Sequence, residues 1–110
     1  MNKKNIAITF LALLSFNAQA DWNATCQKAV SESLDTMDTY LGTARKNLQG
    51  GYITQANFDQ VDTMFKELKL SATTTNCEKS TGNNKAFFEC LANNYGDVMG
   101  CGQKHRPDFK

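Results

Sequence analysis

The sequence contains little of what catalytic and metal-binding chemistry requires. Among its 110 residues there are one histidine, one proline and one tryptophan. A single histidine leaves few options, because metal sites and general-base catalysis use clusters of imidazole, thiolate or carboxylate groups. The chain has no Gly-x-Ser-x-Gly nucleophile motif and no carboxylate pair set apart from the solvated helix faces. We therefore expect a protein that is not an enzyme and that binds no cofactor.

The sequence also lacks a long apolar run and a basic stripe. Its apolar stretch at residues 6–16 is far shorter than the ~20 residues of a membrane-spanning helix. Twelve Lys and Arg, less Lys3 and Lys4, leave ten against eleven Asp and Glu, a net charge of −1. A surface of this kind gives no electrostatic reason to bind nucleic acid or acidic membranes. The expected partner is another protein, recognised by shape and local chemistry.

The first twenty residues have the three zones of a secretory signal peptide. Lys3 and Lys4 form a positive start, the apolar run follows, and Ala18-Gln19-Ala20 supplies small residues before a cleavage site. We predict cleavage after Ala20, which leaves one mature domain over residues 21–110 without a stable membrane anchor. Because no cysteine stands at the cleavage site, a lipid-modified signal is not expected. The predicted location is the periplasm, with the extracellular space as the alternative.

Four cysteines, Cys26, Cys77, Cys90 and Cys101, all lie in the mature part. An even number in a short exported domain is typical of a disulfide framework, since small cores need covalent support. The alternative is a metal site built on Cys101 and His105. Zinc sites use paired cysteines and further ligands, and the chain has no Cys-x-x-Cys pair. The sequence therefore predicts two disulfides and no metal.

Apolar residues repeat at helical spacing in two long segments and one shorter one. Residues 25–49 carry a stripe at steps of three and four, with Thr25 as the expected N-cap and Gly50-Gly51 ending the helix. Residues 54–70 carry a second stripe, with Thr54 as N-cap. Residues 84–94 form a third helix. The predicted core is Val30, Leu34, Met37, Leu41, Phe58, Val61, Phe65, Leu68, Phe88 and Leu91.

These segments predict an all-α fold, a small three-helix array stapled by two disulfides, with a polar connection at 71–84 and an irregular tail at 100–110. Two antiparallel helices joined at the glycines bring Cys26 close to Cys77. A third helix continuing to Met99 would hold Cys101 about 16 Å from Cys90, too far for a disulfide. A break near Asn93–Gly96 would let the chain fold back. This favours Cys26–Cys77 with Cys90–Cys101, while the other two pairings stay open.

Four residues are candidates for contact with a protein partner: Trp22, Tyr52, Tyr95 and Asp97. The two last residues would stand at the tip of a loop closed by Cys90–Cys101. Trp22 and Tyr52 lie outside the apolar stripes, where aromatic rings either anchor an interface or cap the core. No catalytic, cofactor-binding or metal-binding residue is predicted.

The short Lys-Lys signal, four cysteines and helices of 15–25 residues resemble small periplasmic proteins of Gram-negative bacteria. Within that group the chain is similar in build to immunity proteins that protect a cell from secreted wall-degrading toxins, such as the amidase immunity proteins of type VI secretion. The resemblance implies a protein that blocks a toxin or cell-wall hydrolase by direct binding. The alternatives are a periplasmic chaperone or stress protein, which the chain resembles in size and helix content, and a small ligand carrier.

Overall fold

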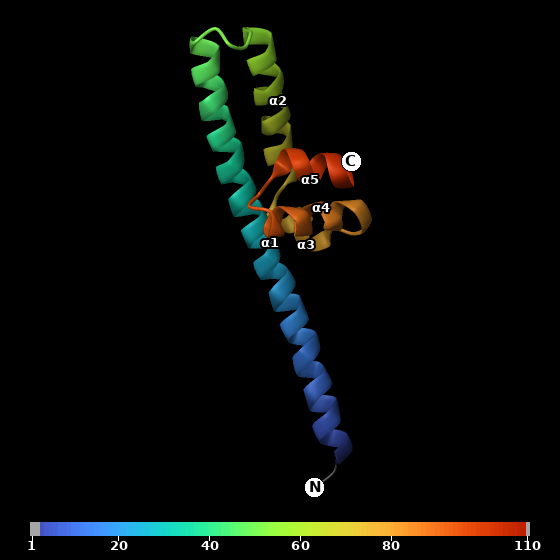
Figure 1. Ribbon diagram of the computed structural model, residues 1–110. Helices are drawn as coiled ribbons and strands as arrows, with labels where there is room; N and C mark the ends of the chain where they lie inside the picture. The colour runs from blue at the N-terminus through green and yellow to red at the C-terminus, as the bar shows by residue number, and fades with distance from the viewer. Residues whose placement is uncertain (1–2, 110) are drawn as a thin grey trace.

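The computed structural model describes residues 3–109, with side chains from Asp21 to Phe109. Within this range the chain forms helices and no strand (Figure 1), as the all-α prediction requires. The helices in chain order are α1 (Lys3–Gln49), α2 (Gln55–Ser71), α3 (Thr74–Lys79), α4 (Gly82–Asn93) and α5 (Val98–His105).

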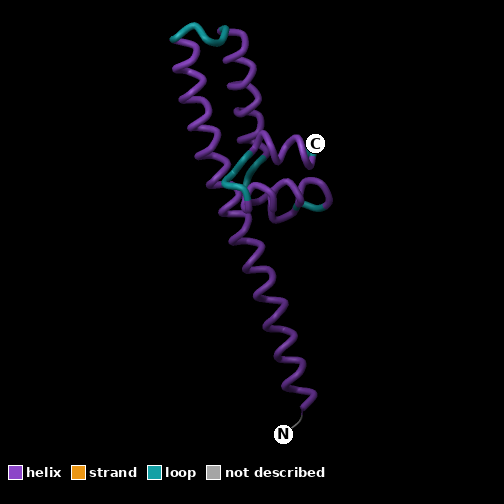
Figure 2. The backbone as a smooth tube through the Cα atoms, viewed as in Figure 1, coloured by secondary structure: helices purple, strands orange, loops and turns teal. Residues whose placement is uncertain are grey.

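Helix α1 is the axis on which the other helices assemble. Helix α2 returns antiparallel to α1 after a short turn, and α3, α4 and α5 gather beside the middle of α1 near the end of α2 (Figure 1). All four shorter helices contact α1, and α4 does so most extensively. The loops lie at the α1–α2 turn, where the short helices meet α1, and between α3 and α4 on the side away from α1 (Figure 2).

The predicted start of the first helix at Thr25 is wrong. Helix α1 is already continuous at Lys3 and passes through Thr25, whose Oγ1 donates to the carbonyl of Asp21, 2.8 Å away. The hydroxyl thus bonds to its own preceding turn instead of capping a helix start. No glycine or proline lies between Ala20 and Cys26 to interrupt the helix. The side chains of the predicted signal peptide, residues 1–20, are not among those that the structure describes. Cleavage after Ala20 stays a prediction.

Helix α2 confirms the sequence prediction closely. Thr54 is its N-cap, and the Thr54 hydroxyl accepts a hydrogen bond from the backbone N–H of Asn57. Asp62 and Lys66 form an ion pair one helical turn apart, at 3.0 Å. Phe58 and Phe65 are the buried residues of this helix.

The three-helix description is too simple, because two further short helices occur. Helix α3 lies within the segment predicted as a polar connection, and Thr73 caps it by accepting from Asn76 N–H. Helix α5 replaces most of the predicted irregular tail, and Asp97 caps it by accepting from Gly100 N–H. Side-chain caps therefore start helices in segments whose composition suggested loops. The third predicted helix corresponds to α4.

Both favoured disulfides are present. Cys26 is joined to Cys77 with a Cα–Cα distance of 5.6 Å, and Cys90 is joined to Cys101 with a Cα–Cα distance of 5.7 Å. The first bond ties α1 to α3 and the second ties α4 to α5. The chain breaks after Asn93, as the geometric argument required. Since disulfides persist in oxidising compartments, the pair points to an exported environment.

The core contains most of the predicted residues. Met37, Leu41, Phe58, Phe65, Phe88 and Leu91 are buried, whereas Leu34, Val61 and Leu68 are partly buried against them. Val30 is only half-buried and lies outside the cluster, so its assignment to the core is wrong. The prediction missed buried members that include Ala29, Ala44, Phe87 and Val98.

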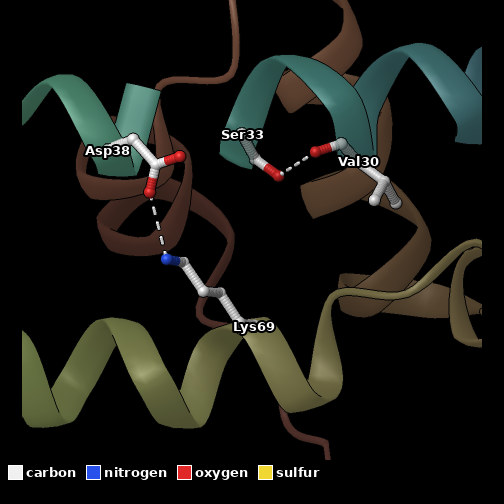
Figure 3. A network of polar contacts seen from close by, with 4 residues as sticks. All are labelled: Val30, Ser33, Asp38 and Lys69. Atoms are coloured by element: carbon white, nitrogen blue, oxygen red, sulfur yellow. Dashed lines mark hydrogen bonds and ion pairs between the residues drawn. The ribbon is translucent and has the colours of Figure 1, made fainter. Parts of the chain in front are cut away.

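One polar side chain is fully buried among the described residues. Ser33 faces the short helices from α1, and its hydroxyl donates to the carbonyl of Val30, 2.9 Å away (Figure 3). This local bond satisfies the hydroxyl and leaves a small side chain where other chain segments approach α1 closely. Figure 3 also shows Lys69 of α2 bound to Asp38 of α1 at 3.1 Å.

Among the described residues, no helix combines the length and the apolar character that crossing a membrane requires.

Candidate functional site

The loop between α4 and α5 is fixed by bonds at both of its ends. The Cys90–Cys101 disulfide closes it, and the N–H of Gly96 donates to the carbonyl of Leu91 at 2.8 Å. The side chain of Asn94 donates to the carbonyl of Cys90, also at 2.8 Å. The loop is therefore held in one conformation by covalent and hydrogen bonds.

The same loop is pressed against α1 with almost no intervening space. A Cβ atom at Gly96, where φ is +72°, would lie 2.3 Å from the carbonyl oxygen of Glu32. The neighbouring small side chain, Ser33, leaves room for this approach. One helical turn away, the hydroxyl of Thr36 donates to the carbonyl of Tyr95 at 2.8 Å. Only glycine fits at position 96, for both its conformation and its contact.

Tyr95 presents its side chain to solvent from this fixed backbone. Its φ of 55° lies in the left-handed region, which is uncommon for an aromatic residue. The Tyr95 side chain is 85% exposed, while its carbonyl is held on α1. Strained backbone of this kind persists where surrounding structure enforces it, and it is frequent at functional sites.

Next to Tyr95, α1 presents a row of hydroxyl and amide side chains. The row, which we call the tyrosine face, consists of Thr36, Thr39, Tyr40, Thr43 and Asn47 of α1 with Tyr95 bonded at one end. The steps from Thr36 to Tyr40, then to Thr43 and then to Asn47 are four, three and four residues, so these side chains share one side of the helix. Tyr40 is 46% exposed, and its ring meets that of Phe65 edge-on at 5.5 Å.

Two depressions lie along the tyrosine face, with Tyr40 and Thr43 lining both. One measures about 400 Å³ and is lined by Asp35, Thr36, Thr39, Tyr40 and Thr43. The other measures about 270 Å³ and lies between α1 and α2, lined by Tyr40, Thr43, Ala44, Asn47, Ile53, Asn57 and Val61. Asp35 is the one charged residue among these described lining residues. Such a surface offers hydrogen bonds and aromatic area with little charge to desolvate.

The four predicted contact residues are not brought together. Tyr52 is 82% exposed at the α1–α2 turn, where its N–H donates to the carbonyl of Asn47. It stands at the opposite end of the tyrosine face from Tyr95, roughly 16 Å along α1 by the helix rise per residue. Asp97 is exposed, but its carboxylate is engaged as the N-cap of α5.

Trp22 lies away from the tyrosine face and packs on the short helices. Its indole N–H donates to the carbonyl of Glu78 at 3.4 Å, and the ammonium of Lys85 lies 5.0 Å from the ring centre. The ring is partly buried against the core, which matches the core-capping alternative. The tyrosine face itself was missed, although its residues repeat at the same helical steps as the apolar stripe.

The cysteines and His105 do not form a metal site in this structure. All four cysteine sulfurs are bonded in disulfides, and His105 belongs to the last turn of α5. Among the described residues, no group of three or more His, Cys, Asp or Glu side chains is positioned to hold a metal ion.

Comparison of the chain with protein-family models, with curated proteins and with solved structures found no match.

Proposed function

We propose that this protein is an exported protein-binding module that blocks a secreted toxin or cell-wall hydrolase by direct contact, in the manner of an immunity protein or inhibitor. The tyrosine face is the observation that carries the proposal. Tyrosine is enriched at the energetic centres of protein interfaces, because its ring supplies contact area and its hydroxyl supplies a hydrogen bond. The periplasm is the proposed compartment, supported by the signal pattern and by the two disulfides.

Rigidity supports inhibition over a looser mode of binding. Residue 95 is fixed by the Cys90–Cys101 disulfide and by the Thr36 hydrogen bond, and Tyr40 rests on the buried ring of Phe65. A surface that is ordered before binding loses little conformational entropy on association, so more of its contact energy contributes to affinity. A chaperone would instead need apolar surface that adapts to many clients, and the tyrosine face places hydroxyl and amide groups on a fixed backbone.

The test uses the purified, disulfide-bonded protein immobilised on a sensor surface and exposed to secreted and periplasmic protein fractions. A captured protein is identified and purified. Its ability to degrade isolated cell wall is then measured alone and after addition of the present protein in solution. We expect binding and loss of that activity at one equivalent. A captured partner whose activity is unchanged would contradict the inhibitor role.

Three variants locate the contact. Tyr95→Asn removes the ring and keeps a residue that tolerates the left-handed conformation. Thr39→Arg places a charge on the tyrosine face, and Thr63→Arg makes the same exchange at an exposed position of α2 that lines neither depression. We expect the first two to weaken binding by about tenfold or more, and the third to leave it unchanged. Equal loss in all three, or in none, would place the interface elsewhere.

A further inference from the structure

A third cavity lies on the side of the molecule where α2 faces α5 and the C-terminal tail, outside the tyrosine face. Its volume is about 430 Å³, within the usual range for small-molecule pockets. Helix α2 lines it with Met64, Phe65 and Leu68, and α5 lines it with Val98 and Met99. Since a water molecule takes roughly 30 Å³ of liquid, the space suits a ligand of about a dozen non-hydrogen atoms.

Behind the surface of this cavity lies an aromatic layer whose two inner rings, Phe65 and Phe87, are closed to solvent. Phe65 and Phe87 are each 1% exposed, and Phe109 meets the ring of Phe87 edge-on at 5.8 Å. At the rim, Met64 and Met99 are partly exposed, and their flexible thioether chains adapt to ligands of different shape. The walls therefore favour an apolar, preferably aromatic, group.

The tail wall of the cavity is held in place by the chain itself. Arg106 adopts a left-handed conformation, φ 46°, which ends α5 and turns the chain back. Asn84 of α4 then binds the tail backbone twice, donating to the carbonyl of Asp108 and accepting from its N–H, both at 2.7 Å. These bonds hold Pro107 and Phe109 against the cavity, so the pocket exists before any ligand enters.

The charge at the rim selects the ligand class. Glu67 is the one charged side chain among the described lining residues, and it has no ion-pair partner among the described residues. The neighbouring cations on α2 are engaged, Lys66 with Asp62 and Lys69 with Asp38. Ser71, the last residue of α2, also lines the cavity, and a helix C-terminus carries partial negative charge.

We infer that this cavity binds a lipophilic amine, a small molecule with an apolar or aromatic body and a protonated amino group. The body lies against Met64, Met99 and the partly buried ring of Phe109, with the closed rings of Phe65 and Phe87 behind them. The ammonium lies at the rim beside the carboxylate of Glu67. A carboxylic acid of the same shape is disfavoured, because the carboxylate of Glu67 repels its charge.

The test compares three probes of one shape by calorimetric titration of the disulfide-bonded protein: 1-naphthylmethylamine, 1-naphthylmethanol and 1-naphthoic acid at neutral pH. We expect the amine to bind most tightly and the acid most weakly. An exposed ion pair is worth at most about 1 kcal/mol, so Glu67→Gln should weaken the amine about two- to fivefold and leave the alcohol unchanged. An acid that binds as well as the amine would overturn the proposed ligand class.

Gly102 provides a matched pair of variants for the location. A Cβ at this position would lie 4.0 Å from the ring of Phe87, in ordinary contact, so an added methyl group fits without displacing its surroundings. Gly102→Leu should fill the cavity and abolish binding of all three probes, whereas Gly102→Ala should keep binding within about threefold. Circular dichroism and non-reducing peptide mapping confirm that both variants keep the helices and the disulfides. Binding that survives Gly102→Leu, or no binding of any probe to the unaltered protein, would overturn the inference.

Discussion

Two parts of the molecule reach stability by different routes. The hairpin arm, which is α2 with residues 37–49 of α1, contains no cysteine. The cystine base, which is α3, α4 and α5 with residues 21–36 of α1, contains all four. In Figure 1 the arm is a pair of long antiparallel helices, and the base is a cluster of short ones beside them.

The difference follows from helix length. Helices shorter than about 12–15 residues are marginal in water by themselves, because the cost of nucleation is spread over few hydrogen bonds. Helix α3 has 6 residues and α5 has 8, whereas α2 has 17. Each short helix contains one cysteine bonded to a longer helix, Cys77 to α1 and Cys101 to α4. The disulfides therefore lie where helix propensity contributes least.

The arm depends on side-chain packing, and Phe65 tests this most strongly. The residue is 1% exposed and contacts Tyr40 of α1 edge-on. Phe65→Ala should lower the free energy of unfolding by about 3–5 kcal/mol through lost burial and the cavity left behind. Phe58→Ala, near the turn and beneath the guanidinium of Arg45, should cost less, since that ring is 9% exposed at the distal end of the arm. Urea unfolding measures both, and a loss below about 1 kcal/mol for Phe65→Ala would show that the arm does not depend on its core.

The base depends on its covalent bonds, and their loop lengths predict unequal effects. The Cys26–Cys77 bond closes a separation of 51 residues, against 11 for Cys90–Cys101. On the chain-entropy model, the double variant Cys26→Ala, Cys77→Ala should lose about 4 kcal/mol, and Cys90→Ala, Cys101→Ala about 3 kcal/mol. Urea unfolding of the two pairs under identical conditions gives the comparison. A larger loss for the short loop would mean that native-state packing, and not chain entropy, governs the base.

Within the cystine base, Gly96 is the point where the α4–α5 loop meets α1. Comparing its replacement with that of Gly51 separates the cost of close contact from the cost of backbone conformation. Gly96→Ala should cost about 3 kcal/mol or more, because the left-handed φ is unfavourable for alanine and its Cβ overlaps the backbone of Glu32. Gly51, at the turn of the arm, also has a positive φ but open space around it. Gly51→Ala should therefore cost only about 1–2 kcal/mol. Equal thermal destabilisation of both variants would show that the approach to α1 is not tight.

The long helices could be read from the sequence, and the short ones could not. The sequence predicted α2 to within one residue at each end, because a cap at Thr54 and a regular stripe through Phe58 and Phe65 are local signals. The start of α1 was wrong, since Thr25 is a good cap but nothing before it breaks the helix. Helix α5 contains Gly100 and Gly102, poor helix formers, yet burial of Val98 and Cys101 outweighs that preference.

The candidate site was predicted only in part, because the sequence shows local signals and not which segments meet in space. Exposure of Tyr95 followed from the loop that Cys90–Cys101 had to close. The polar row containing Tyr40 was missed because it is recognised only beside the apolar stripe, once both are placed on α1. The cavity between α2, α5 and the tail depends on the left-handed turn at Arg106 and on the hydrogen bonds from Asn84 to the tail. No sequence pattern indicates either feature.

The smallest predicted effect concerns the helix caps, which occur in both parts of the molecule. Thr54 begins α2 in the arm and Thr73 begins α3 in the base, and each hydroxyl accepts one backbone N–H at 3.1 Å. Thr81 begins α4 in the same extended conformation but makes no side-chain cap bond. Thr54→Ala and Thr73→Ala should each cost about 1 kcal/mol, whereas Thr81→Ala should fall within about 0.5 kcal/mol of the unaltered protein. Thermal unfolding of the three variants decides whether a cap adds the same stability to a helix held by packing as to one held by a disulfide. A loss for Thr73→Ala well below that for Thr54→Ala would mean that the Cys26–Cys77 bond already fixes the start of α3.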